Sequence, residues 1–589
     1  MQSAGRRGRL VWLLISAATL FLVGLATYIV WVDTGRPVWG VDDAVIFFVY
    51  ARNMAAGHGI VYNVGGPHVE GASSFLYLLI CWLAWLLFPH PCVALLLFNG
   101  LLIVASCLLV WWLCSHMERA LALPRYSAII FFAAFLLWML ANPPFFFWTA
   151  VSLMDSEVFS VLLVAAFTIL ARLVLKQTAT ARDASLLSFV IVLTVLARPE
   201  GMGWGLLDAL AFLAIVYPPA SARTVSWRLL LLPAAAFVIG LAALIGFREL
   251  YFGHALPTTY YAKVTSNHFA TLRDGFHYFH MFVRFYRRWL LLPFAIAFCC
   301  AAFSLIRRDY MRTFRLTVVA MVFATAGFLV PVAEGGDHFN SFRLYQASFP
   351  LFCILPVIAV LPLFRRGKTS LGTTALLVLS LCFVMSTGST WAAFKRENAR
   401  ILVTAPDINA SYPSANRFET FLAATELVNG RQVREMFAPD LPTIGYMAAG
   451  GFAYAYDGQV YDLLGLNDER MARADPVKIG LKDHASFNSG VFYLESPEIV
   501  LPETVRAPSH VNLQEIYDSS FSPSSFLNLF FKGILSSTRF QSEYRFAYVR
   551  SSLHPDLSCY GYFRLDYLKT LLESGKFQLI QFMPTTPRH

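Results

Sequence analysis

The sequence predicts a polytopic α-helical membrane protein that carries a soluble α/β domain at its C-terminus. Of its 589 residues, 57% are apolar and only 14% are charged, whereas soluble domains contain about 45–50% apolar and about 25% charged residues. A single soluble core stops growing beyond about 250–300 residues, so it cannot bury this many apolar side chains. Lipid is therefore the expected solvent for much of the chain, and a cytosolic enzyme is disfavoured.

The charge and the cysteines argue against two other classes of protein. The chain has 46 Lys and Arg against 36 Asp and Glu, but the basic residues lie in short patches between apolar runs. Membrane proteins fix their orientation in this way, so we expect no nucleic-acid partner. The 9 Cys lie almost all in apolar runs and form no CxxC motif, so we predict neither a disulfide framework nor a zinc ribbon.

Eleven apolar runs are candidates for membrane spans, which need about 20 mainly apolar residues. Arg6, Arg7 and Arg9 precede the first run, whose apolar stretch is too long for a signal peptide and has no small-residue cleavage site after it. We therefore expect a retained anchor with its N-terminus in the cytoplasm. The predicted spans are 10–32, 92–114, 126–141, 157–175, 184–197, 203–218, 229–249, 289–305, 317–333, 345–363 and 370–389.

Eleven spans that start from a cytoplasmic N-terminus place five basic loops in the cytoplasm, as the positive-inside rule requires. A further apolar run, 73–88, reaches about 24 Å as a helix and falls short of the ~30 Å hydrocarbon core. We predict that it is a re-entrant or interfacial helix, ended by Pro89-His90-Pro91. The basic loops contain Arg119 and Arg125; Lys176 and Arg182; Arg223 and Arg228; Arg307, Arg308, Arg312 and Arg315; and Arg365, Arg366 and Lys368.

After residue 390 the sequence gains Pro, Asn, Asp and Ser. About 200 residues suffice for one α/β domain. The predicted organisation is a transmembrane domain 1–389 with a functional first outer loop 33–91, followed by a soluble domain 390–589 on the outer, extracytoplasmic face.

Two adjacent carboxylates, Asp42 and Asp43, follow the first span. Residues 44–56 show helical spacing of apolar positions, so the pair is expected at or just before a helix start, where backbone N–H groups favour negative charge. A carboxylate kept ionised just above the hydrocarbon could serve as a general base, attract a cation or cap the helix. A cap needs one acid and this site has two, which favours a chemical role for one of them.

More ionisable groups lie at the predicted outer ends of other spans. Taken singly, they are ordinary loop charges or snorkelling anchors. Together they indicate an acidic, water-filled cavity that opens outward, with cations able to hold a phosphate. The acids are Asp155, Glu157, Glu200, Glu334 and Asp337, and the cations are Arg52, Arg198, Lys263 and Arg343.

The histidines give no strong metal motif. His277 and His280 are three residues apart, but neither HExxH nor a paired Cys/His spacing accompanies them. We therefore predict no required metal or cofactor. A divalent cation that bridges Asp42 or Asp43 to a phosphate is left open as an alternative.

Several motifs carry a family resemblance. Residues 42–79, DDAVIFFVYARNMAAGHGIVYNVGGPHVEGASSFLYLL, resemble the first outer loop of GT-C fold glycosyltransferases that use polyprenyl-phosphate sugars. The terminal arabinofuranosyltransferase family of mycobacteria, with its relatives in other bacteria, is the nearest match. The further matching motifs, in family order, are ARPEG (197–201), LPTTYYAKV (256–264), EGGDHFNSFRLYQ (334–346) and YDLLGLNDERMA (461–472).

The resemblance implies a GT-C fold and an inverting membrane glycosyltransferase of the bacterial inner membrane. It would move a sugar, D-arabinofuranose in the family that it resembles, from a polyprenyl-phosphate donor to an envelope glycan or protein on the periplasmic side. The predicted outward position of the site agrees with this donor, because an outward-facing site receives no nucleotide sugars and its sugar donor must arrive on a lipid. The chain departs from the family at Val49, Ala72-Ser73-Ser74 and Asp155-Ser156, which bears on the sugar more than on the reaction.

This resemblance implies roles for individual residues. One of Asp42 and Asp43 is the expected base, with Asp42 preferred because it precedes the helix more loosely. Arg52, Lys263 and Arg343 are expected to bind the donor phosphate. The expected sugar- and acceptor-binding residues are Asn53, Glu70, Arg198, Glu200, His254, Tyr260, Asp337, His338, Tyr345, Asp468 and His484, the last two from the soluble domain.

Three other functions explain part of the sequence. A lipid-linked-sugar flippase would also have many spans and cavity charges, but transporters usually show inverted repeats, and a soluble domain of this size is surplus to transport. A scaffold that binds envelope polymers explains the soluble domain but not the paired Asp. A GT-C enzyme for a different sugar is the third alternative, which the altered first loop leaves open.

Overall fold

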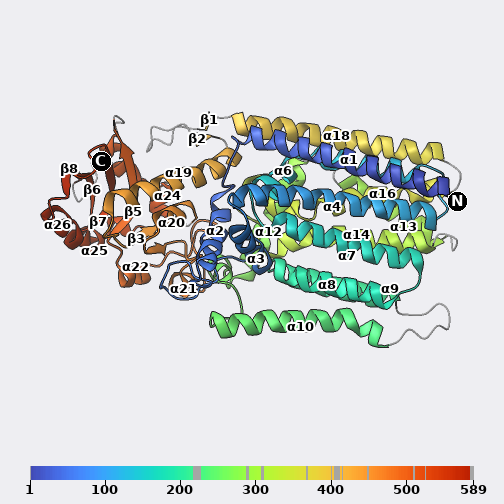
Figure 1. Cartoon of the computed structure of the whole chain (residues 1–589), viewed down its shortest axis with the longest axis horizontal. Coiled ribbons are helices and arrows are strands. Elements are labelled where there is room, and N and C mark those ends of the chain that lie inside the picture. Colours follow the sequence, from blue (N-terminus) through green and yellow to red (C-terminus); the bar gives the residue numbers. More distant parts are fainter. Residues whose placement is uncertain are drawn as a thin grey trace.

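The computed structural model describes residues 2–583 except 217–226, 287–290, 307–310, 366–368, 400, 403–411, 414, 448–449, 508–510 and 524. A bundle of long helices fills one end of an elongated molecule, and a smaller domain with a β-sheet fills the other (Figure 1). The bundle part contains α1 (Gln2–Asp33), α2 (Asp42–Ala55), α3 (Phe75–Leu87), α4 (Pro91–Ala120), α5 (Ser127–Leu140), α6 (Pro143–Phe146), the π-helix η1 (Phe147–Val151), α7 (Ser156–Lys176), α8 (Ala181–Ala197), α9 (Gly201–Val216), α10 (Trp227–Tyr251), α11 (Thr258–Lys263), α12 (His268–Phe285), α13 (Leu292–Ile306), α14 (Met311–Ala333), the 3₁₀ helix η4 (Asn340–Phe342), α15 (Arg343–Gln346), α16 (Phe349–Ala359), α17 (Leu361–Arg365) and α18 (Thr369–Ala399).

The C-terminal domain is an α/β domain, as predicted. It contains β1 (Ile401–Leu402), β2 (Tyr412–Pro413), α19 (Ala415–Phe437), β3 (Ile444–Tyr446), α20 (Gly451–Tyr456), β4 (Val460–Asp462), α21 (Glu469–Arg473), α22 (Ser489–Glu495), β5 (Ile499–Arg506), α23 (Leu513–Ser520), α24 (Phe526–Phe530), the 3₁₀ helix η5 (Ile534–Ser536), α25 (Thr538–Glu543), β6 (Tyr544–Ser551), β7 (Leu557–Arg564), α26 (Leu565–Glu573) and β8 (Phe577–Phe582).

Its six-stranded sheet has the order β4-β3-β5-β7-β6-β8. β3 pairs in parallel with β4 and β5, and the remaining pairs are antiparallel. α19 packs against α20 and β5. The helix before the domain, α18, continues to Ala399, past the predicted boundary at residue 390.

Six helices in the described part of the chain are long and apolar enough to cross a membrane: α1, α4, α7, α10, α14 and α18. Two bent pairs, Ser127–Leu140 with Pro143–Val151 and Asn340–Gln346 with Phe349–Phe364, raise the number to 8 if each pair is one span. The other three predicted spans correspond to α8, with 17 residues, and to α9 and α13, whose described parts have 16 and 15 residues and border residues that the structure does not describe. Of these, α8 is shorter than the usual spanning length. The predicted fold class, a polytopic helical membrane protein with a C-terminal α/β domain, is confirmed.

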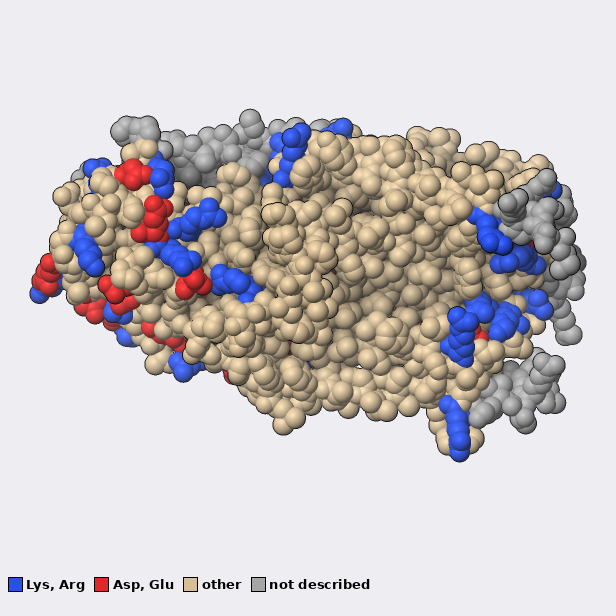
Figure 2. Space-filling model, viewed as in Figure 1, with Lys and Arg blue, Asp and Glu red and all other residues tan. Residues whose placement is uncertain are grey.

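The ends of the bundle differ in charge. Blue Lys and Arg side chains gather at the end farthest from the C-terminal domain, the middle of the bundle is nearly free of charge on the visible face, and both signs mix on the C-terminal domain (Figure 2). The N-terminus lies at the first of these ends, opposite the C-terminal domain (Figure 1). Of the predicted basic-loop residues, Arg223, Arg307, Arg308, Arg366 and Lys368 lie outside the described residues.

The first loop forms two short helices between the bundle and the C-terminal domain. α2 begins at Asp42, as predicted, and its two acids at the first turn and Arg52 at the last turn complement the helix dipole. α3 has 13 residues and reaches only about 20 Å, so it is too short to span, also as predicted. α2 packs on α3 and on α20 of the C-terminal domain.

Candidate functional site

A cavity of about 570 Å³, called here the main cavity, lies between the bundle and the C-terminal domain. Its walls come from the first loop, the segment that joins α8 to α9, the α11 region, the segment after α14, and residues 466 and 478–485 of the C-terminal domain. The charged residues that line it are Asp43, Asp155, Arg198, Glu200, Lys263, Asp274, Glu334, Asp337, Arg343, Lys478, Lys482 and Asp483. The predicted cavity with both acids and cations is therefore present.

The paired Asp residues at the start of α2 point to different places. Asp43 lines the main cavity, and its Oδ2 lies 3.7 Å from Nη1 of Arg343. Asp42 is buried and accepts hydrogen bonds from the backbone N–H groups of Gly450 (3.1 Å) and Gly451 (2.7 Å) at the start of α20. The preference for Asp42 as the cavity residue was wrong, because adjacent helical positions face different sides.

Asp42 instead joins the first loop to the C-terminal domain. Burial raises its pKa to about 6, against the opposing effect of the two backbone hydrogen bonds. A carboxylate whose two oxygens both accept backbone hydrogen bonds cannot also move to reach a substrate. Asp43 is the member of the pair that is open to the cavity, with 25% of its side chain exposed.

Arg343 connects Asp43 to a second carboxylate. Its Nε donates to Oδ2 of Asp337 at 2.7 Å, and its guanidinium lies over the ring of Phe339, 4.4 Å from the centroid. The backbone turns sharply before it, since Ser341 and Phe342 both have left-handed φ angles (60° and 56°). This turn directs Arg343 back toward Asp337, so both stand in the cavity wall as predicted.

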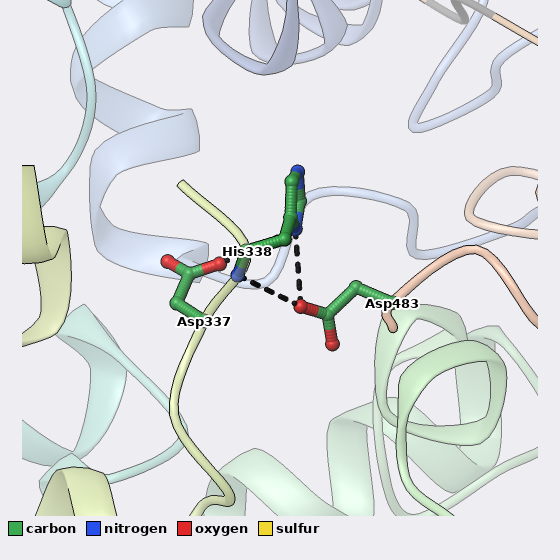
Figure 3. A group of neighbouring side chains, drawn as sticks. All are labelled: Asp337, His338 and Asp483. Atoms are coloured by element: carbon green, nitrogen blue, oxygen red, sulfur yellow. Dashed lines mark hydrogen bonds and ion pairs between the residues drawn. The ribbon is translucent and has the colours of Figure 1, made fainter. Parts of the chain in front are cut away.

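His338 lies between two carboxylates, as Figure 3 shows. Its Nδ1 is 3.4 Å from Oδ1 of Asp337 and 3.0 Å from Oδ2 of Asp483, which comes from the C-terminal domain. Burial raises the pKa of Asp483, but the His338 hydrogen bond and the charge of Lys263 outweigh it and leave the pKa below its usual range. The predicted His484 stands beside this cluster, with its ring 4.7 Å from that of His338.

The cluster Asp337, His338 and Asp483 is the one group of possible metal ligands found in the described part of the chain, with ligand atoms within 4.8 Å of one another. Arg343 already pairs with Asp337, and Lys482 lies 3.9 Å from Asp483. Each carboxylate thus already has a cation beside it. We therefore assign the cluster to an ionic contact between the bundle and the C-terminal domain rather than to a metal.

Arg198 organises the acids at another part of the cavity wall. It donates to Oδ1 of Asp155 at 2.7 Å and also pairs with Glu200. The predicted Tyr260 and Lys263 line the cavity as well. Tyr345 does not: its buried ring stacks on Phe282 at 4.0 Å.

Three predicted residues of the first loop lie away from the main cavity. Arg52, proposed for the donor phosphate, donates to the backbone oxygen of Tyr454 at 2.6 Å and pairs with Asp457. Asn53 holds the following turn by donating to two backbone carbonyls. Glu70 forms a buried two-pronged ion pair with Arg248 (2.8–3.1 Å).

Two further predicted substrate-binding residues lie elsewhere. His254 contacts Glu469 and Arg473 of α21. Asp468 caps α21 by accepting from the backbone N–H of Met471 at 3.0 Å. The side chains of Arg52 and His254 connect the two parts of the chain, those of Asn53 and Glu70 hold the bundle part together, and that of Asp468 caps a helix.

The C-terminal motif 461–472 docks against the first loop. The hydroxyl of Tyr50 donates to Oδ1 of Asn467 at 3.0 Å and accepts from the backbone N–H of Gly71 at 3.1 Å. Asn467 is fixed in turn by Asp462, which accepts from its backbone and side-chain N–H groups. Because Gly71 and Leu466 line the main cavity, this joint sets the cavity's shape.

Among the charged residues that escaped prediction are Arg248, Lys478, Lys482 and Asp483. Arg248 lies inside a predicted span, so its charge was read as part of an apolar run. The other three lie in the segment KIGLKDH (478–484), a charged stretch between helices of the C-terminal domain. The density of charged residues in this segment was the sequence signal that could have predicted a place in the cavity wall.

No protein-family model matches the chain, and no curated protein does. Among solved structures, ArnT from Cupriavidus metallidurans in the apo state is 12% identical, with a TM-score of 0.49 over 84% of this chain and 93% of that chain. The same ArnT bound to undecaprenyl phosphate has a TM-score of 0.44 at 12% identity, over 78% and 89%. The archaeal oligosaccharyltransferase AglB from Archaeoglobus fulgidus, in complex with an inhibitory peptide and a dolichol-phosphate, has 0.46 at 12% identity, over 94% and 74%. These likenesses are loose, so the roles proposed below rest on the contacts of this chain.

Proposed function

We propose that the protein is an inverting glycosyltransferase of the GT-C type that takes a sugar from a polyprenyl-phosphate donor. The observation that carries the proposal is the position of Asp43, open to a cavity of about 570 Å³ and 3.7 Å from Arg343. The family motifs supply the reaction class. The geometry supports it because an acid, a cation and enclosed space stand together at the end of an apolar bundle.

Asp43 acts as the general base. It accepts the proton of the acceptor hydroxyl as that oxygen attacks the anomeric carbon, while the bond from that carbon to the lipid phosphate breaks with inversion. Arg343 orients Asp43, and positive charge from Lys263 stabilises the departing phosphate. General base catalysis of this kind contributes about 10²–10⁴ in rate.

The donor reaches the cavity from the outer side of the membrane. Basic side chains gather at the bundle end opposite the C-terminal domain (Figure 2), and the positive-inside rule assigns that end to the cytoplasm. The main cavity and the C-terminal domain then face the periplasm of a bacterial inner membrane. Nucleotide sugars are absent there, so a lipid carrier is the donor that this orientation favours.

The sugar proposed is D-arabinofuranose, and the acceptor is an envelope glycan or glycoprotein. The motif resemblance supports the sugar. The acidic side of the cavity, where Arg198 holds Asp155 and Glu200, offers carboxylate oxygens that accept hydrogen bonds from sugar hydroxyls.

The test is transfer by the purified chain in detergent, with labelled polyprenyl-phosphoryl arabinofuranose and, in parallel, other pentose and hexose donors on the same lipid. The expected result is a glycosylated acceptor of inverted anomeric configuration, formed from the arabinofuranosyl donor. Movement of the intact donor across vesicles without any transfer would refute the enzyme and favour a flippase. Transfer of another sugar alone would refute only the arabinofuranose assignment.

A further inference from the structure

A second cavity, called here the side cavity, adjoins the main cavity. It has a volume of about 710 Å³ and lies between α12 and residues 335–342. Three residues line both cavities: Asp274, Asp337 and Lys482. The two spaces therefore meet at the segment that carries Lys482.

The side cavity has an apolar wall. Tyr278, Met281 and Phe285 of α12 line it, and Phe339 and Phe342 face them. The outer surface of α12 also carries exposed apolar residues, with Phe269 80% and Phe276 59% exposed, among exposed polar residues such as Arg273. A helix with an exposed apolar face at the end of a membrane bundle is suited to contact with lipid.

The cations at the main cavity differ in how they are paired. Arg198 and Arg343 each form ion pairs with carboxylates. Lys478 donates to the backbone oxygen of Ala472 and to Ser486. Among the residues that the structure describes, Lys263 has no hydrogen bond or ion pair, and Lys482 has only the 3.9 Å contact with Asp483.

The neighbouring carboxylates already have partners. Asp337 pairs with Arg343, Asp483 accepts from His338, and Asp274 pairs with Arg273. Among the described residues, three cations of this region therefore have donors to spare: Lys263 of the bundle part and Lys482 of the C-terminal domain at the main cavity, and Arg284 of α12 in the side cavity. Two such ammonium groups beside an apolar space fit an amphipathic anion, a phosphate attached to a hydrocarbon chain.

We infer that Lys263 and Lys482 together bind a phosphate monoester or diester at the junction of the two cavities, and that the side cavity takes the first units of its lipid chain. The inference rests on the proposed function, and it adds a phosphate-binding residue from the C-terminal domain in place of Arg52. Arg343 bridges Asp43 and Asp337, so this phosphate position is separated from the base by one guanidinium and one carboxylate.

The experiment measures binding of a polyprenyl monophosphate to the full chain in nanodiscs, without any sugar transfer. Lys263→Met and Lys482→Met are each expected to weaken binding about ten- to a hundredfold. Lys569→Met is the control, because this lysine of the same domain is 77% exposed and pairs only loosely with Glu573. Lipid binding by both cavity variants at the strength of wild type would overturn the inference.

A second arm separates the lipid from a free phosphate. Inorganic phosphate is expected to compete only weakly, and Met281→Asp, which places a charge in the side cavity, is expected to weaken lipid binding but not phosphate binding. Equal affinity for the lipid and for inorganic phosphate, or no effect of Met281→Asp, would overturn the role of the side cavity. Lysine-dependent lipid binding without sugar transfer would leave this inference standing while the proposed function fails.

Discussion

Gly71 is a residue at which a small change should disturb docking of the C-terminal domain. A Cβ atom at this position would lie 1.8 Å from Oδ1 of Asn467 and 2.7 Å from the hydroxyl of Tyr50. Both are far inside van der Waals contact, and both atoms belong to the joint between the first loop and the C-terminal domain. Gly71→Ala must therefore push Asn467 away.

The cost follows from the contacts that are lost. Overpacking a well-packed site typically costs about 1–3 kcal/mol, and each buried polar group left without its partner costs about 1–3 kcal/mol. We expect Gly71→Ala to weaken the joint by about 2–5 kcal/mol, since the Tyr50–Asn467 hydrogen bond cannot survive the displacement. A change of 2 kcal/mol corresponds to about a 30-fold larger population of the open form.

Hydrogen exchange of the backbone amides in residues 461–472 measures that population. Exchange in Gly71→Ala should be at least about 30-fold faster, and transfer activity should fall with it because Gly71 lines the main cavity. Gly246→Ala is the matched control, since a Cβ there, inside α10, meets nothing within 4 Å.

A double substitution tests the mechanism of the clash. Asn467→Ala removes the atom that the new Cβ would strike, so the combined cost of Gly71→Ala and Asn467→Ala should be smaller than the sum of the single costs. Unchanged exchange in Gly71→Ala, or strictly additive costs, would refute the reasoning.

Three further predictions concern other contacts. Arg248→Met should destabilise the chain by about 3–5 kcal/mol in denaturant unfolding, because it leaves the buried Glu70 carboxylate unpaired. Adding Glu70→Gln should restore most of this stability. A double variant that is no more stable than Arg248→Met would contradict the pairing. Arg343→Lys should lower the rate of sugar transfer by about 100-fold, because an ammonium cannot hold Asp337 and face Asp43 at once. A transfer rate within threefold of wild type would contradict this role of Arg343. Burial raises the pKa of Glu503 from 4.5 to about 7, so the stability from its bound proton is full below about pH 4.5 and is lost as the pH rises through 7. Glu503→Gln should therefore reduce the dependence of the unfolding free energy on pH, measured by urea unfolding of the C-terminal domain. An unchanged pH dependence would show that another group titrates.

The fold class and the cavity were predictable because they depend on composition and on charge in apolar surroundings. The length of each apolar run predicted the long spans, and two acids before a helical pattern predicted the start of α2. The span count was less predictable, because α8 packs in the bundle at a length close to the threshold. Sequence length alone does not separate a short span from a bent or partial one.

The roles within the motifs were harder to predict. Asp42 and Asp43 are neighbours with the same chemistry, and only the position of Gly450 and Gly451, about 400 residues later, decides which one is held by backbone amides. Arg52, Glu70 and Asp468 lie in the same motifs as cavity residues but join elements or cap a helix. Lys482 and Asp483 reach the cavity through tertiary contacts that no local pattern reports.

The single-turnover rate of sugar transfer in Asp43→Asn, compared with Asp42→Asn and wild type, tests the central assignment most directly. With excess enzyme and labelled donor, Asp43→Asn should be slower than wild type by about 10²–10⁴ while it melts at the wild-type temperature. Asp42→Asn should lose stability at the α20 contact and keep most of its rate per folded molecule. A folded Asp43→Asn that transfers sugar at the wild-type rate would contradict the assignment.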